Sequence, residues 1–123
     1  MLTFRPIAMI ASAFCLALSV LWFADVSAYT ALYGIEVGEG GNQLGRRASP
    51  ILLGLGVLLY LARDEAPSPL RRTVCLGAVL IFAGVGMTGL IAYQSGAASY
   101  AILVAALTEF AVAAVMYSVA QDS

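Results

Sequence analysis

Long apolar segments alternate with short polar ones along this chain, and their lengths predict helices that cross a membrane. A spanning helix needs about 20 predominantly apolar residues at about 1.5 Å per residue. The predicted spans cover residues 6–24, 48–62, 73–93 and 98–120. They leave a glycine-rich outer loop at 25–47 and a charged cytoplasmic loop at 63–72. The pattern predicts an all-α fold, a four-span transmembrane helical bundle that forms one domain over residues 1–123.

The third and fourth spans are separated by a weak polar break. No residue from Thr73 to Thr108 is charged. As one helix this stretch would run about 54 Å, well beyond a hydrocarbon core of about 30 Å. The polar break in the stretch is Gln94-Ser95-Gly96, so we expect the chain to turn back there into a tight helical hairpin.

The second span is shorter than the others. Fifteen uncharged residues lie between Arg47 and Arg63, which is about 22 Å of helix. Ser49-Pro50 is typical of an N-cap followed by the first helical position, which shortens the span further. We therefore expect the backbone of Arg47 to lie several ångströms inside the membrane.

The first span has an alternative interpretation as part of a cleaved signal peptide over residues 1–28. Arg5 supplies a short basic region, and Val26-Ser27-Ala28 has the small-x-small form of a cleavage site. Against this, the apolar stretch at 6–24 is longer than the usual 7–15 residues or so of a signal peptide. Trp22 also lies where an interfacial aromatic belt belongs. A retained span is favoured, and the alternative stays open.

The arginines predict the orientation in the membrane. Cytoplasmic loops of membrane proteins carry an excess of Lys and Arg. Four arginines fall on one side of the predicted bundle and two on the other: Arg5, Arg63, Arg71 and Arg72 against Arg46 and Arg47. Both termini are therefore predicted to be cytoplasmic.

Composition agrees with a membrane protein and excludes several kinds of chemistry. The chain is 62% hydrophobic and 11% charged, whereas soluble domains average about 45–50% and 25%. A net charge of −1 argues against nucleic-acid partners. The absence of His and Lys removes imidazole and Schiff-base chemistry, and Cys15 and Cys75 are isolated. We expect no enzyme activity, no catalytic residues, no cofactor and no metal site.

Glu109 is the single charged residue inside the predicted 98–120 span. Charges at such depth are costly and usually face a bundle interior. Its row of small neighbours recurs every four residues, and a similar row lies on the third span, so we expect the rows to face each other. The rows are Ala101, Ala105, Glu109 and Ala113 on one side, and Gly84, Thr88 and Ala92 on the other.

This arrangement predicts an intramembrane polar site. Thr88 would donate a hydrogen bond to Glu109, and Arg46 or Arg47 is the candidate cationic partner. Three roles for Glu109 remain open. It locks helices together as a hydrogen-bonded carboxyl, or moves protons or cations, or contacts a partner subunit or lipid-like ligand.

Four short motifs resemble small bacterial four-helix membrane proteins of the DoxX-like type. They are Leu32-Tyr33-Gly34, Gly45-Arg46-Arg47, Gly54-Leu55-Gly56 and Leu61-Ala62-Arg63, all within residues 29–63. The resemblance implies a four-helix bundle in the inner membrane. It carries over no functional residues.

The functional expectation is a non-catalytic, multi-pass protein of the bacterial inner membrane that serves as an accessory or assembly subunit. Its expected partners are the lipid bilayer and other membrane subunits or further copies of itself. This preference rests on the short chain, which offers little room for an internal binding cavity. The alternative is a small homo-oligomeric transporter or channel that uses Glu109 as a protonatable intramembrane carboxyl.

Overall fold

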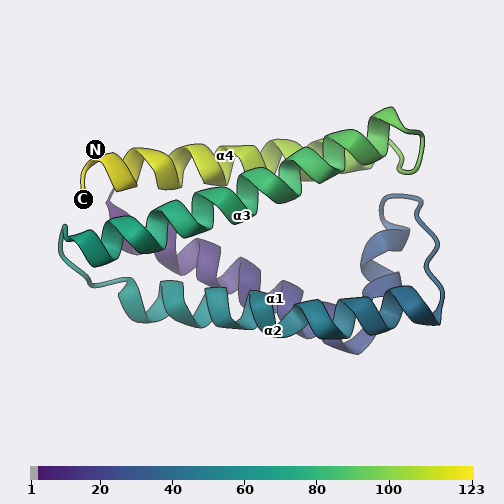
Figure 1. Cartoon of the computed structure of the whole chain (residues 1–123), viewed down its shortest axis with the longest axis horizontal. Helices are drawn as coiled ribbons and strands as arrows, with labels where there is room; N and C mark the ends of the chain where they lie inside the picture. Colours follow the sequence, from purple (N-terminus) through teal and green to yellow (C-terminus); the bar gives the residue numbers. More distant parts are fainter. Residues whose placement is uncertain (1–2) are drawn as a thin grey trace.

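The protein is all-helical, as the apolar pattern predicts. The computed structural model describes residues 3–123, and Met1 and Leu2 of the predicted domain lie outside the described residues. No strand occurs among residues 3–123. Four helices, each long and apolar enough to cross a membrane, follow one another along the chain (Figure 1): α1 Phe4–Ala31, α2 Glu39–Ala62, α3 Pro69–Gln94 and α4 Ala101–Gln121. The four-span helical fold is confirmed.

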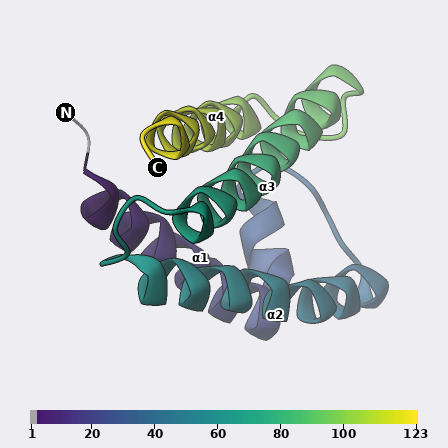
Figure 2. The ribbon, with the colours of Figure 1, turned by 60° about the vertical axis from the view of Figure 1, so that its left-hand side comes forward.

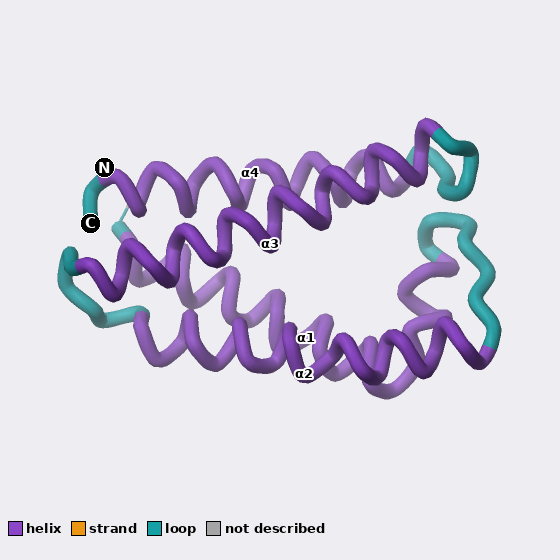
Figure 3. Tube along the Cα trace, viewed as in Figure 1, coloured by secondary structure: helices purple, strands orange, loops and turns teal. Residues whose placement is uncertain are grey.

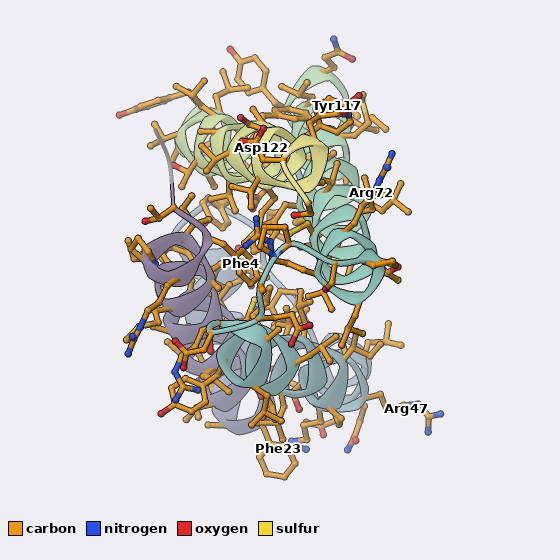
Figure 4. All side chains as sticks on the ribbon, turned by 90° about the vertical axis from the view of Figure 1, so that its left-hand side faces the viewer. Phe4, Phe23, Arg47, Arg72, Tyr117 and Asp122 are labelled. Carbon is orange, nitrogen blue, oxygen red and sulfur yellow. The ribbon has the colours of Figure 1, made fainter. Side chains whose placement is uncertain are left out.

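The helices pack as two hairpins that touch each other mainly at one end. Helix α1 packs along α2 and α3 packs along α4, whereas contacts between the hairpins are few (Figure 2). Both termini and the 63–68 connector lie at what we call the terminal end, and the 32–38 and 95–100 connections lie at the loop end (Figure 3). The shared core draws on all four helices and includes Phe4, Leu59, Cys75, Phe82 and Met116. Phe4 lies between the hairpins in the view from the terminal end (Figure 4).

Two buried serines join the helices of the first hairpin. Ser12 Oγ donates to the carbonyl of Gly56 at 2.6 Å, and Ser19 Oγ donates to the carbonyl of Ser49 at 3.0 Å. The two donors are seven residues apart on α1 and the two acceptors seven apart on α2, which is the spacing of equivalent positions on antiparallel helices. In an apolar surrounding, such side-chain bonds between helices add to close packing.

Glycines allow the helices of both hairpins to approach closely. A Cβ built at Gly56 would lie 2.9 Å from the Leu16 side chain. In the second hairpin, a Cβ at Gly86 would lie 3.1 Å from the ring of Phe110. A side chain at either position would have to displace its neighbour, and small residues are the usual means by which helix backbones in membranes come close.

The face of α4 that packs on α3 differs from the expected one. Ala106 lies against Gly89, 3.4 Å from a Cβ built there. Gly84 has open space in that position, and Thr88 is exposed. The expected facing rows are therefore wrong: the helices meet through glycines that lie on another side of α3. Small residues are plentiful on both of these sides of α3, so their spacing in the sequence does not show which side packs on α4.

Helix α1 breaks at Asp25. Its backbone is extended there, with φ −164° and ψ 92°, so the helical segment that follows takes a new direction (Figure 1). The Asp25 carboxylate accepts from the Ser27 backbone N–H at 3.1 Å and also from the Ser27 hydroxyl. This is the bond that an N-cap makes to the second helical residue. The predicted end of the first span at Ala24 falls at this break.

Much of the glycine-rich segment is helical, which the sequence pattern did not predict. Helix α2 begins at Glu39, so residues 39–47 belong to it and not to a loop. A Cβ built at Gly45 would lie 2.7 Å from Val26, so the segment is held by packing against the part of α1 beyond its break. Tertiary contact thus overrides the low helix propensity of glycine.

Pro50 lies within α2 and does not begin a helix. Proline lacks the N–H that would bind the carbonyl four residues earlier. Ser49 Oγ donates to that carbonyl, Arg46 O, at 2.9 Å and so replaces the missing bond. The other Ser-Pro pair does start a helix: Ser68 Oγ accepts from the Arg71 N–H at 3.1 Å, and Pro69 is the first residue of α3.

Candidate functional site

A cavity of about 440 Å³ lies between the two hairpins, on the loop-end side of the shared core. We call it the inter-hairpin cavity. All four helices contribute to its largely apolar wall. Its volume falls within the range of about 300–1,000 Å³ that small-molecule sites usually have. The expectation that so short a chain has little room for a cavity is therefore wrong, because the hairpins diverge and leave the space between them unfilled.

A short segment crosses the cavity at the loop end. We call residues 26–34 the cross-segment; it begins at the Asp25 break and runs toward the second hairpin (Figure 1). The Ser99 N–H donates to the carbonyl of Tyr33 at 2.8 Å, which ties the two hairpins at this end. Gly34 follows with φ +70°, a conformation that favours glycine. The break in α1 therefore supplies one wall of the cavity.

Three aromatic side chains form a cluster on this wall. The ring centroids of Trp22 and Tyr29 are 5.6 Å apart, and those of Tyr29 and Tyr33 are 5.2 Å apart with an edge-on arrangement. All three line the cavity. The Trp22 Nε1–H is buried and has no hydrogen-bond partner among residues 3–123. A buried donor without an acceptor is costly, so this group marks a place where a ligand oxygen or water fits.

Glu109 enters the cavity from α4. Ala101 and Ala105 precede it on the same face and also line the cavity, so the small-residue row opens space in front of the carboxyl. Among residues 3–123, Glu109 is the only charged side chain that lines the cavity, and no ion pair or side-chain hydrogen bond is formed to it. The other titratable side chains on the wall are Tyr29, Tyr33 and Cys15.

The four residues of the predicted polar site do not come together. Thr88 is exposed and donates to the carbonyl of Val85 at 2.7 Å. Arg46 pairs with Glu39 at 3.6 Å and donates to the carbonyl of Phe23 at 3.4 Å.

Arg47 points away from the bundle (Figure 4). Neither arginine lines the cavity. Of the predicted site, Glu109 alone faces it. The arginines stay outside because α2 extends beyond them and carries them on its polar first turns.

The cavity opens sideways between α1 and α4. Phe14 and Val104 line it from these two helices, yet they are 54% and 65% exposed. A shallow apolar groove continues from it along α1, past Ile10 and Ala17. Both helices are long and apolar enough to cross a membrane, and in a bilayer that they span this opening would face lipid.

The geometry suits binding within the membrane. A carboxyl and an unpartnered indole N–H lie in an otherwise apolar cavity, which is the usual composition of a small-molecule site. Among residues 3–123, no three acidic or cysteine side chains gather as a metal site requires. Comparison with protein families, with curated proteins and with solved structures finds no match for the chain.

Sequence reasoning missed the aromatic cluster. Trp22, Tyr29 and Tyr33 had a sufficient explanation as interface anchors at span ends. Tyr29 and Tyr33 are four residues apart, which is the spacing of neighbours on one helical face and was the available signal. Trp22 joins them only through the break at Asp25, which the sequence pattern did not predict.

Proposed function

We propose that the protein is a small, non-catalytic transporter or channel of the bacterial inner membrane that binds its cargo in the inter-hairpin cavity. Glu109 is the protonatable group that meets the cargo, and it releases its proton when a cationic cargo binds. Both termini are cytoplasmic in this proposal, as the arginine counts favour. The resemblance of residues 29–63 to DoxX-like proteins stays a prediction.

One observation carries the proposal: the carboxyl of Glu109 faces the cavity and has no partner among residues 3–123. A carboxyl whose role is to lock helices together would bind a donor on a neighbouring helix. Thr88, the expected donor, bonds instead to its own helix. Intramembrane carboxyls that face a cavity commonly mark ion or proton pathways.

Flux through liposomes tests this function. Purified protein is reconstituted, and flux is measured under imposed proton, sodium, potassium and benzyltrimethylammonium gradients for the unmodified chain and for Glu109→Gln. Glu36→Gln, in the connection between α1 and α2, is the matched control. The expected result is flux that Glu109→Gln abolishes and Glu36→Gln leaves unchanged. Flux no greater than that of empty liposomes under every gradient overturns the proposal, as does full flux with Glu109→Gln.

A second candidate function is that of an accessory or assembly subunit, and the outer face of α3 favours it. Gly77 and Gly84 have open space where a side chain would begin, and Thr88 on the same face is exposed. A row of small residues lets another membrane helix approach closely. The occupant is either a helix of another subunit or a second copy of this chain.

Co-purification tests the subunit function. The tagged chain is extracted from its native membrane in mild detergent, and the mass of the complex is measured. Gly84→Leu is expected to release the partner, whereas Gly54→Leu, at an equally open glycine of α2, is expected to retain it. A chain that always purifies as a monomer contradicts this function.

A further inference from the structure

The geometry points to a lipophilic organic monocation as the ligand of the inter-hairpin cavity, held with its ammonium group between Glu109 and the Trp22–Tyr29–Tyr33 cluster. This inference rests on the proposed function and names its substrate class. Charge, aromatic content, size and access each support the assignment.

Charge is the first argument. Within residues 3–123, Glu109 is the one charged side chain on the wall, and the six arginines lie outside it. An ionised carboxylate in an apolar space needs a positive partner, because an unpaired charge there is strongly disfavoured. A ligand with one positive charge neutralises the site. In the empty cavity the carboxyl carries its proton and is neutral; when the cation binds, the proton passes to water, so the net charge of the cavity is unchanged.

The aromatic cluster is the second argument. Tyr29 contacts both Trp22 and Tyr33, at centroid distances of 5.6 and 5.2 Å, so the three rings form one cluster on the cavity wall, with their faces turned in different directions. Aromatic faces attract ammonium groups, most strongly when the ion has lost its water. A quaternary or tertiary ammonium suits such a wall better than an inorganic cation does, because its alkyl groups also contact apolar side chains. The indole N–H of Trp22 can donate a hydrogen bond to an ether or carbonyl oxygen of the same ligand.

Size and access agree with this class. A cavity of about 440 Å³ accommodates a small organic molecule, not a folded peptide segment. The rest of the wall is apolar, and in a bilayer that the helices span the opening between α1 and α4 would face lipid, so the ligand must partition into the bilayer. A lipophilic cation does so, whereas a strongly hydrated metal ion does not.

Trp22 provides the test, because it is the only tryptophan in the chain and lines the cavity. The purified full chain in lipid nanodiscs is titrated with benzyltrimethylammonium and, separately, with neopentylbenzene, its uncharged carbon isostere. Trp22 fluorescence reports binding. The cation is expected to bind the unmodified chain roughly tenfold or more tightly than Glu109→Gln, as for a hydrogen bond or ion pair to a charged group. The uncharged isostere is expected to bind both proteins equally.

Two further variants keep the result interpretable. Glu109→Asp retains the charge and is expected to preserve cation binding, while Glu36→Gln removes a carboxylate outside the cavity and is expected to change nothing. Circular dichroism and elution volume verify that each variant is folded. Cation binding that is equal in the unmodified chain and Glu109→Gln overturns the monocation assignment and leaves cavity binding standing. No response of Trp22 to either probe overturns both.

Discussion

Ser12 donates a hydrogen bond of 2.6 Å to the backbone carbonyl of Gly56, across the interface of α1 and α2. A Cβ at the same glycine would lie 2.9 Å from the Leu16 side chain, which would have to shift. The bond and the close approach depend on each other: the hydroxyl reaches the α2 backbone because no side chain at position 56 intervenes. The Ser12 bond and the close packing at Gly56 thus stabilise the first hairpin at the same place along its helices. Separate substitutions can test each of them.

Replacement of Ser12 by Ala is expected to lower the free energy of unfolding by about 0.6 kcal/mol, and at most by about 1.7 kcal/mol, the range measured for side-chain bonds between membrane helices. Unfolding by sodium dodecyl sulfate, followed by circular dichroism, measures the change. Ser118→Ala, at an exposed position of α4, is the matched control and is expected to change stability little. Equal effects of the two variants would contradict a role for the Ser12 bond.

Replacement of Gly56 by Val is expected to destabilise the protein by about 1–3 kcal/mol, because the added atoms overlap Leu16 and push the helices apart. Gly54→Val introduces the same side chain two residues earlier on α2, where the space is open. That control is expected to be neutral. The same detergent titration compares them, and a stable Gly56→Val protein would show that the hairpin is looser than described.

Replacement of Asp25 by Ala is expected to unfold the first turn of the cross-segment. The lost N-cap lowers the free energy of unfolding by about 1 kcal/mol. Tyr29 and Tyr33 then leave the cavity wall, so Trp22 emission shifts to longer wavelength and the cationic probe binds more weakly. Asp25→Asn retains an acceptor for the Ser27 N–H and is expected to behave like the unmodified chain. Unchanged emission and binding with Asp25→Ala would mean that the break does not depend on the cap.

Cysteine labelling tests the topology. In a background of Cys15→Ala and Cys75→Ala, single cysteines are placed at Ala66 and Asp122 of the terminal end, or at Gln43 and Ser95 of the loop end. An impermeant maleimide applied to spheroplasts is expected to label the loop-end pair and to reach the terminal-end pair only after lysis.

Labelling of the terminal-end pair in intact spheroplasts would reverse the proposed orientation. Different labelling within either pair would contradict the arrangement of four spans. The arginines that favour the orientation do gather at the terminal end, where Arg5 and Arg63 both pair with Asp64, at 3.3 and 3.5 Å.

The apolar pattern was enough to predict four helices, because membrane spans are defined by length and composition and both can be read directly. It did not predict the helical start of α2, since Gly45 becomes helical through its contact with Val26, a residue that lies nineteen positions away. The two Ser-Pro pairs make the same point. Identical dipeptides end up inside one helix and at the start of another, according to whether a neighbouring helix holds the preceding turn.

The candidate site was predicted only in part. A lone glutamate in an apolar span was a strong signal, and Glu109 does face a cavity. Its surroundings depend on the angle between the hairpins and on the break at Asp25, and both arise from contacts between residues far apart in the sequence. The alanine row on α4 was correctly seen as a small-residue face, yet its Ala101 and Ala105 line the cavity, and Ala113 lies in the shared core.

The hairpin arrangement also determines the order in which the structure can assemble. Each hairpin is formed by consecutive helices, so its internal contacts connect nearby parts of the chain and can form as soon as its second helix enters the membrane. Contacts of this local kind form quickly. Those that enclose the cavity, such as the bond from Ser99 to Tyr33, span 66 residues and must wait for the second hairpin. The binding site is therefore the last part of the molecule to come into existence, and a nascent chain that stalls between α2 and α3 already possesses a complete interface but no site.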